Sequence, residues 1–229
     1  MIIHIITLFP EVFDPILNIS ILKRAQNKGL ATIKLYNLRN WTSDKHKTVD
    51  DRPYGGGAGM ILKVEPVYRA IKEIKTKTKN NQLKTFLLSP RGKIFNQKLA
   101  QDLGGLKEIL LICGRYEGFD ERIKNFIDEE ISIGDYVLAG GEIAAMAITE
   151  AVIRLLPGVL KKSEATENES FSGLNDQILL EYPQYTRPEV FLNFRVPKVL
   201  LLGDQQKINL WQKTKSQKLT KKHRPDLLK

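Results

Sequence analysis

A run of apolar residues that ends in a glycine-bearing loop occupies residues 108–118, which read EILLICGRYEG. The large aliphatic side chains from Ile109 to Ile112 predict a strand at Glu108–Cys113 that is buried on both faces. Two other strand-like runs end in similar loops: Lys84–Leu88 leads into residues 88–92 (LSPRG), and Glu130–Ile133 leads into residues 133–141 (IGDYVLAGG). Strands of this kind occur in parallel sheets covered by helices, so the sequence predicts an α/β fold.

The remaining residues up to about 160 alternate between strand-like and helix-like segments. Further strands are predicted at Ile2–Phe9 and Ala31–Leu38, and a long loop at Asn40–Met60. Helices are predicted at Ser20–Lys28 with Ser20 as N-cap and Gly29 after its end, at Val64–Lys75, at Asn96–Leu103 with Asn96 as N-cap, at Asp120–Phe126, and at Gly141–Leu156 before Pro157. We expect a mostly parallel sheet in a domain of residues 1–160, a polar linker at 161–175 and a small, basic, helical domain at 176–229.

The chain of 229 residues carries a formal net charge of +10, and basic residues are concentrated near its C-terminus. Residues 198–229 hold nine Lys or Arg residues against two acids, Asp204 and Asp226. A basic surface attracts phosphate backbones, although a solvated helix has the same composition. The charge therefore favours a nucleic acid as partner without identifying one.

Several classes of protein do not fit this composition. Cys113 is the only cysteine, so neither an internal disulfide nor a cysteine-based zinc cluster can form, and we expect it to be a buried apolar residue. The three histidines, His4, His46 and His223, lack the spacing of metal ligands. No apolar run is long enough for a membrane span, and Ile2–Phe9 lacks the flanks of a signal peptide, so a cytoplasmic location is expected.

The three glycine-bearing loops are expected to converge on one binding site. Ligands of open α/β sheets bind beyond the carboxyl ends of the strands, and glycines allow a ligand to approach the backbone closely. One such loop is usually a tight turn, but three at equivalent strand ends favour a site. The first strand is not followed by G-x-G-x-x-G, and G-x-x-x-x-G-K-[ST] is absent, so a dinucleotide or P-loop site is not supported.

Six stretches of the sequence resemble, in order, one family of enzymes. They read TLFPEVF at residues 7–13, KTVDDRPYGGG at 47–57, LSP at 88–90, CGRYEG at 113–118 with DER at 120–122, SIGDYVLAGGE at 132–142 and YPQYTRPE at 182–189. One tripeptide would be weak, but the ordered set covers roughly residues 1–205 and is specific. On these residues the chain resembles the bacterial tRNA (guanine-N1)-methyltransferases, the TrmD family of the SPOUT class.

The resemblance implies a fold, a reaction and two partners. The three loops would be the walls of a trefoil knot and would bind S-adenosyl-L-methionine in a bent shape. The enzyme would be a homodimer with sites shared between subunits, and would methylate N1 of guanine 37 of tRNA, just 3′ of the anticodon. Neither DNA nor a membrane is expected as a partner. The residues implied to bind the cofactor are Leu87, Leu88, Ser89, Pro90, Gly114, Tyr116, Glu117, Gly118, Ile133, Gly134, Asp135, Tyr136, Val137, Leu138, Gly140 and Gly141.

This reaction needs a general base, because guanine N1 carries a proton and is a poor nucleophile until that proton leaves. The family places the base immediately before a Ser-Phe pair, here Ser170-Phe171, so the resemblance assigns it to Glu169, with Glu167 as the alternative. Arg154 is implied as the catalytic arginine that stabilises charge on guanine O6. A cation at that helix end would also complement the helix dipole.

The resemblance also implies contacts to tRNA and to a metal ion. Asp50, Arg52 and Tyr54 would contact the target base or its neighbours, and Glu117 is the candidate ligand for magnesium. Two other functions stay open. One is a SPOUT methyltransferase with another RNA target, for example a ribose 2′-hydroxyl. The acid before Ser170-Phe171 and the block YTRP at residues 185–188 argue against it. The other is a non-catalytic, basic RNA-binding protein, which would bind the cofactor without turnover.

Overall fold

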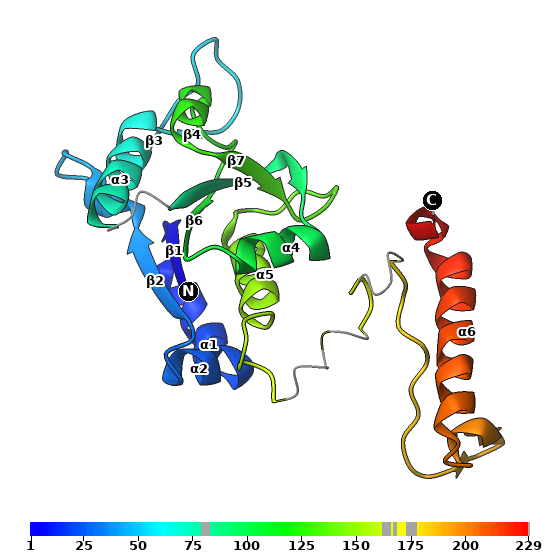
Figure 1. The fold of residues 1–229 in the computed structure, drawn as a ribbon. Helices are drawn as coiled ribbons and strands as arrows, with labels where there is room; N and C mark the ends of the chain where they lie inside the picture. Colours follow the sequence, from blue (N-terminus) through cyan, green and yellow to red (C-terminus); the bar gives the residue numbers. More distant parts are fainter. Residues whose placement is uncertain (79–82, 162–165, 167–168, 173–177, 229) are drawn as a thin grey trace. The chain divides into compact units, whose positions relative to one another are not determined.

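A computed structural model describes residues 1–78, 83–161, 166, 169–172 and 178–228. The chain divides into two compact units, Met1–Lys161 and Lys162–Lys229 (Figure 1). Among the described residues, no helix combines the length and the apolar character needed to cross a membrane.

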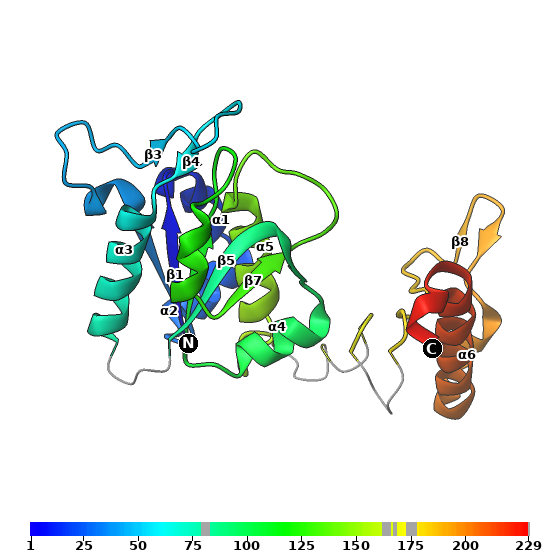
Figure 2. The ribbon, with the colours of Figure 1, turned by 90° about the horizontal axis from the view of Figure 1, so that it is seen from above.

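Five parallel strands form the central sheet of the first unit (Figures 1 and 2). Their order across the sheet is β2-β1-β6-β5-β7, and each neighbouring pair runs parallel. The predicted α/β class with a parallel sheet is therefore confirmed. The strands are β1 (Ile2–Thr7), β2 (Thr32–Asn37), β5 (Lys84–Ile94), β6 (Glu108–Cys113) and β7 (Glu129–Ser132).

Helices cover both faces of this sheet, as its apolar inner strands β1 and β6 require. Side chains alternate between the faces: Ile3 and Ile5 belong to one core cluster and Ile6 to the other. Full burial of such a side chain contributes about 1.5–3 kcal/mol relative to exposure. Side chains of α3 (Val64–Lys77) belong to the second cluster. The first cluster includes side chains of α1 (Asp14–Leu17), α2 (Ser20–Asn27), α4 (Gln97–Gly104) and α5 (Glu142–Ile153).

Most helix ends lie close to the predicted capping residues. The side-chain oxygen of Asn96 accepts a hydrogen bond from the Leu99 amide at 2.9 Å and caps α4. Gly29, just past α2, adopts a φ of 68°. The prediction that Ser20 is the N-cap of α2 was wrong. Ile19 is the N-cap because its backbone is still extended (φ −122°, ψ 160°), and Ser20 is the first helical residue.

Three predicted elements differ in extent near the glycine-bearing loops. Strand β5 does not end at Leu88 but continues to Ile94, with a register shift between Leu88 and Lys93, so residues 89–92 form a bulge within the strand. Residues Glu121–Phe126 form a 3-10 helix, η3, instead of an α-helix. Helix α5 ends at Ile153 instead of Leu156, and Arg154 is its C-cap.

The long loop predicted between Asn40 and Met60 contains a short strand. Strand β3 (Asp50–Asp51) pairs antiparallel with β4 (Ile61–Leu62), so the glycine-rich residues 54–59 join the two strands. The remaining short elements of the first unit are the 3-10 helices η1 (Pro10–Phe13) and η2 (Leu38–Trp41).

The second unit contains one long helix and a short hairpin. Helix α6 (Gln205–His223) is capped by Asp204, whose carboxylate accepts a hydrogen bond from the Lys207 amide at 3.1 Å. The hairpin pairs β8 (Val190–Phe191) with β9 (Phe194–Arg195), and the sequence had not suggested it. The 3-10 helices η6 (Lys198–Leu200) and η7 (Pro225–Leu228) flank α6.

A buried histidine in β1 is expected to make the stability of the fold depend on pH. His4 is 3% exposed, and its ring nitrogens contact the Tyr36 hydroxyl at 2.9 Å and the Glu108 carboxylate at 3.3 Å. Burial lowers its pKa below the usual 6.5, although the hydrogen bond to Glu108 opposes this shift. The unfolded chain therefore binds the proton more readily, and stability present above pH 6.5 is lost as the pH falls below it.

We expect the melting temperature of the protein to fall between pH 7.5 and pH 5, and to fall less in His4→Gln. Thermal unfolding followed by circular dichroism across this range measures both. His223→Gln is the matched control, because that histidine is exposed. Equal pH dependence in wild type and His4→Gln would show that other groups are responsible.

Candidate active site

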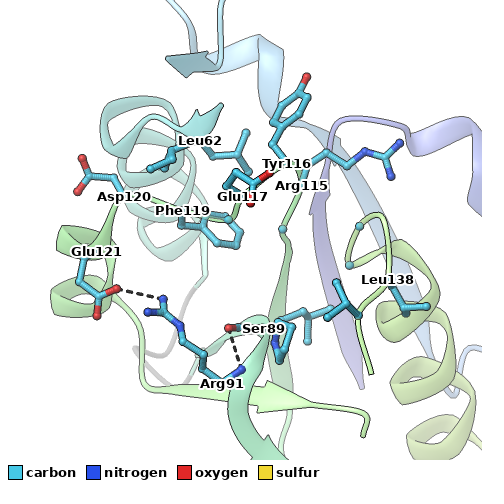
Figure 3. A pocket seen from close by; sticks show the side chains of 18 of the residues that line it. Leu62, Ser89, Arg91, Arg115, Tyr116, Glu117, Phe119, Asp120, Glu121 and Leu138 are labelled. Carbon is cyan, nitrogen blue, oxygen red and sulfur yellow. Dashed lines mark hydrogen bonds and ion pairs between the residues drawn. The ribbon is translucent and has the colours of Figure 1, made fainter. Parts of the chain in front are cut away.

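A cavity of about 1170 Å³ lies at the bulge of β5 and the carboxyl ends of β6 and β7. All three predicted loops line this cavity. The lining residues of the loops are Leu88–Arg91, Gly114–Gly118 and all of Ile133–Gly141 except Asp135. Figure 3 shows Ser89, Phe119 and Leu138, which come from three different segments, around the same space. The rest of the lining comes from Asp51–Tyr54, Ile61–Glu65 and Phe119–Arg122, together with Ile131, Ser132 and Ala144.

Nearly all residues predicted to bind the cofactor line this cavity. Leu87 does not, because it alternates with Leu88 along β5 and is buried in the core cluster that contains α3. Asp135 does not line the cavity either, and its side chain is exposed. Of the predicted tRNA contacts, Arg52 and Tyr54 line the cavity, while Asp50 is paired with Leu62 in the short β3–β4 sheet.

The second and third loops are held together by backbone contacts. The Gly141 amide donates a hydrogen bond to the Gly114 carbonyl at 2.8 Å, and Arg115 and Gly140 form an isolated antiparallel bridge. A Cβ atom on Gly141 would lie 2.8 Å from both Cys113 Cα and the Gly114 nitrogen. Only glycine allows this approach, because the atoms that it meets belong to the backbone.

The second loop is also joined to the strand that follows the glycine-rich segment. The Glu117 amide donates to the Met60 carbonyl at 3.0 Å, and the Leu62 amide donates to the Gly118 carbonyl at 2.9 Å. The Asp120 amide in turn donates to the Leu62 carbonyl at 3.0 Å. The loop expected to bind the cofactor and the segment expected to contact RNA are therefore one connected structure.

Several of the side chains that line the cavity are charged. Arg91 pairs with Glu121 at 3.0 Å (Figure 3), and Arg122 pairs with Asp120 at 2.6 Å. The hydrogen bond from Arg122 holds the pKa of the Asp120 carboxyl below its usual value. The exposed carboxylate of Glu117 lines the cavity as well. In the part of the chain that the structure describes, no three His, Cys, Asp or Glu side chains gather into a metal site.

The two predicted catalytic residues lie in different units. Arg154 is the half-buried C-cap of α5 in Met1–Lys161. Glu169 is half-buried in Lys162–Lys229, and its carbonyl accepts a hydrogen bond from the Ser172 amide at 3.2 Å. The alternative base, Glu167, lies outside the described residues.

Some residues of the cavity were not predicted. Arg115 and Phe119 line it, although the resemblance assigned neither a role. Arg115 belongs to the second loop and Phe119 directly follows it. Their position in the sequence could therefore have identified them as lining residues. Cys113, just before this loop, is buried as predicted, and burial, with the nearby Glu142 carboxylate, raises the pKa of its thiol. A thiol in this state is unreactive at neutral pH.

Comparisons with known proteins are consistent over the whole chain. A family model described as tRNA (Guanine-1)-methyltransferase TrmD matches residues 1–229. The chain is 56% identical over 228 residues to a tRNA (guanine-N(1)-)-methyltransferase of Carboxydothermus hydrogenoformans, covering 99% of this chain and 87% of the relative. It is 51% identical over 226 residues to a protein of the same name from Dictyoglomus turgidum, covering 99% and 89%. A third, from Caldanaerobacter subterraneus, is 50% identical over 229 residues, covering 100% and 92%.

Proposed function

Because the chain belongs to the tRNA (guanine-1)-methyltransferase family TrmD, we propose that its cavity holds the methyl donor and that its target is guanine 37, just 3′ of the anticodon. The protein transfers a methyl group to N1 of a guanine in tRNA, and S-adenosyl-L-methionine is the donor that its family implies. The observation that carries the proposal is the convergence of three glycine-bearing loops on one cavity. We expect the enzyme to act in the cytoplasm.

The lining of the cavity suits a bent S-adenosyl-L-methionine molecule. Apolar side chains of Leu88, Ile133 and Leu138 can enclose an adenine ring, and glycine backbones allow close approach to ribose. The contact of Gly141 with the second loop supports a further proposal, that the chain there forms the trefoil knot typical of SPOUT enzymes. When bound, the cofactor supplies a methyl group on a positively charged sulfur.

The chain's own residues would supply acid–base chemistry and charge stabilisation. We assign Glu169 as the general base that accepts the N1 proton of guanine. The electron pair of N1 would form the new bond to the methyl carbon, and the electron pair of the carbon–sulfur bond that breaks would remain on sulfur. The guanidinium of Arg154 would stabilise the negative charge that spreads onto O6.

A magnesium ion fits the proposal through Glu117. Mg²⁺ sites often use one or two protein carboxylates and keep several waters, so a cluster of protein ligands is not required. Glu117 is exposed and lines the cavity, which suits such a role. The ion would neutralise charge beside the methionine part of the cofactor.

A homodimer with shared sites is supported by an apolar surface of the first unit. Val12, Ile16, Ile19 and Ile143 are each at least 39% exposed. They belong to η1, α1, the start of α2 and the first turn of α5, and these elements contact one another. Apolar side chains gathered on one face are typical of protein interfaces. A second copy of this chain would cover them.

Substitution of Gly141 by alanine is expected to weaken cofactor binding by about 5–150-fold. The added Cβ would overlap the backbone of Cys113 and Gly114, and relieving that overlap costs about 1–3 kcal/mol. Isothermal titration with S-adenosyl-L-methionine measures this change. Gly104→Ala is the matched control, since its added Cβ would have only a contact at 4.0 Å and should leave binding unchanged. Wild-type affinity in Gly141→Ala would separate this glycine from the cofactor site.

Raising the salt concentration is expected to weaken tRNA binding steeply while leaving cofactor binding nearly unchanged. Most lysines of α6, including Lys213, Lys218 and Lys221, are exposed. They would contact phosphates of the tRNA, and each contact would release counterions from the RNA. Filter binding of tRNA and titration of the cofactor between about 50 and 200 mM salt test this division. Equal salt dependence for both ligands would refute it.

Methyl transfer from labelled S-adenosyl-L-methionine to two unmodified tRNA transcripts tests the proposed function. One transcript has guanine just 3′ of the anticodon, and the other has adenine there. The expected result is incorporation into the guanine transcript alone, recovered as 1-methylguanosine. Cofactor binding without incorporation into either would instead favour a non-catalytic RNA-binding protein or another RNA target.

A further inference from the structure

The residues TLFPEVF at 7–13 belong to the resemblance but have no part in the reaction proposed above. Thr7 is the last residue of β1 and is 1% exposed. Its hydroxyl accepts a hydrogen bond from the Phe9 amide at 3.0 Å and donates one to Glu142 Oε1 at 2.8 Å. Because the Phe9 amide can only donate, the Thr7 hydroxyl proton is directed to the carboxylate.

Glu142 is an unusual residue for the interior of this unit. It is the first residue of α5 and is only 7% exposed. A carboxylate is costly to bury unless it is hydrogen-bonded and paired with a charge. Thr7 supplies the hydrogen bond, and the guanidinium of Arg115 lies 3.8 Å from Glu142 Oε2.

Arg115 connects two of the three loops that line the cavity. It belongs to the second loop, and its Nη1 donates a hydrogen bond to the Ala139 carbonyl of the third loop at 3.1 Å. Its guanidinium also lies over the Phe9 ring, 4.7 Å from the ring centroid. The orientation of Arg115 is thereby fixed from three sides: by Glu142, by Ala139 and by Phe9.

We infer that Thr7 and Glu142 are positioning residues, which act through Arg115 to set the spacing of the second and third loops and thereby the affinity for S-adenosyl-L-methionine. β1 provides the rigid anchor, Glu142 orients the guanidinium, and the guanidinium ties the two loops together. This inference rests on the proposed function, since it takes the cavity to be the cofactor site. Neither Thr7 nor Glu142 needs to touch the reacting atoms.

The test is a double-mutant cycle on cofactor affinity, read by isothermal titration with S-adenosyl-L-methionine. Glu142→Gln keeps the shape and removes the charge, and Arg115→Met keeps the length and removes the guanidinium. We expect each single variant to raise the Kd for the cofactor about tenfold. The double variant should have no higher Kd than the single variant that binds more weakly. Thr7→Val should also weaken binding, whereas Thr7→Ser, which keeps the hydroxyl, should restore nearly wild-type affinity.

Several outcomes would overturn the inference. If Glu142→Gln lowered the melting temperature but bound the cofactor as tightly as wild type when folded, the carboxylate would only stabilise the fold. Additive losses in the double variant would mean that Glu142 does not act through Arg115. Failure of the wild-type protein itself to bind the cofactor would instead contradict the proposed function, so the two failures are distinguishable.

Discussion

Replacing Glu169 by alanine is expected to lower the rate of methyl transfer by about 10²–10⁴-fold, the usual effect of removing a general base. Guanine N1 would then have to lose its proton to water, while the cavity proposed to hold the donor would be unchanged. Single-turnover transfer to a tRNA transcript gives the rate, and titration with S-adenosyl-L-methionine should give a wild-type Kd. The combination of a slow reaction with normal cofactor binding identifies a residue of the chemical step.

The matched control for this substitution is Glu167→Ala. Both glutamates belong to the same short polar stretch of sequence, so each variant removes one negative charge from that stretch. We expect Glu167→Ala to stay within a few-fold of wild type. A slow Glu167→Ala enzyme with an active Glu169→Ala enzyme would transfer the role of base to Glu167.

The central sheet could be predicted because its inner strands β1 and β6 are nearly continuous apolar runs. The run from Ile109 to Ile112 is completely buried, and the predicted bounds Glu108–Cys113 are those of β6. The location of the cavity followed as well, since loops at the carboxyl ends of parallel strands meet at one edge. These inferences needed only local sequence and the general geometry of parallel sheets.

Features that depend on distant parts of the chain could not be predicted. Residues 89–92 form a bulge in β5 because the strand resumes pairing with β7, and a prediction from local sequence alone ended the strand at Leu88. The hydrogen bond between Thr7 and Glu142 joins residues that are 135 positions apart. The hairpin β8–β9 is only two residues long in each strand, too short for an alternating pattern to appear.

Replacement of Arg154 by lysine or alanine is the second substitution expected to have a large effect. Loss of a donor that stabilises developing negative charge lowers turnover by about 10²–10³-fold. Lysine keeps the charge but not the planar fork of donors, so Arg154→Lys should recover only part of the loss. Multiple-turnover kinetics with saturating cofactor and tRNA measure the effect as a fall in kcat.

The competing explanation is that Arg154 only complements the dipole of α5, since it is the C-cap of that helix. Arg24 offers a matched control, because it is an exposed arginine in the last turn of α2. Loss of the interaction with the helix dipole should lower the free energy of unfolding of Arg154→Ala and of Arg24→Ala by about 0.3–1 kcal/mol, measured by urea unfolding. If Arg154→Ala lost only this stability, as we expect of Arg24→Ala, and kept its kcat, the arginine would be structural. A large fall in kcat in Arg154→Ala, with no such fall in Arg24→Ala, would assign Arg154 to the reaction. An interaction with the dipole of α5 is the same in the ground state and in the transition state, so its loss would not lower kcat.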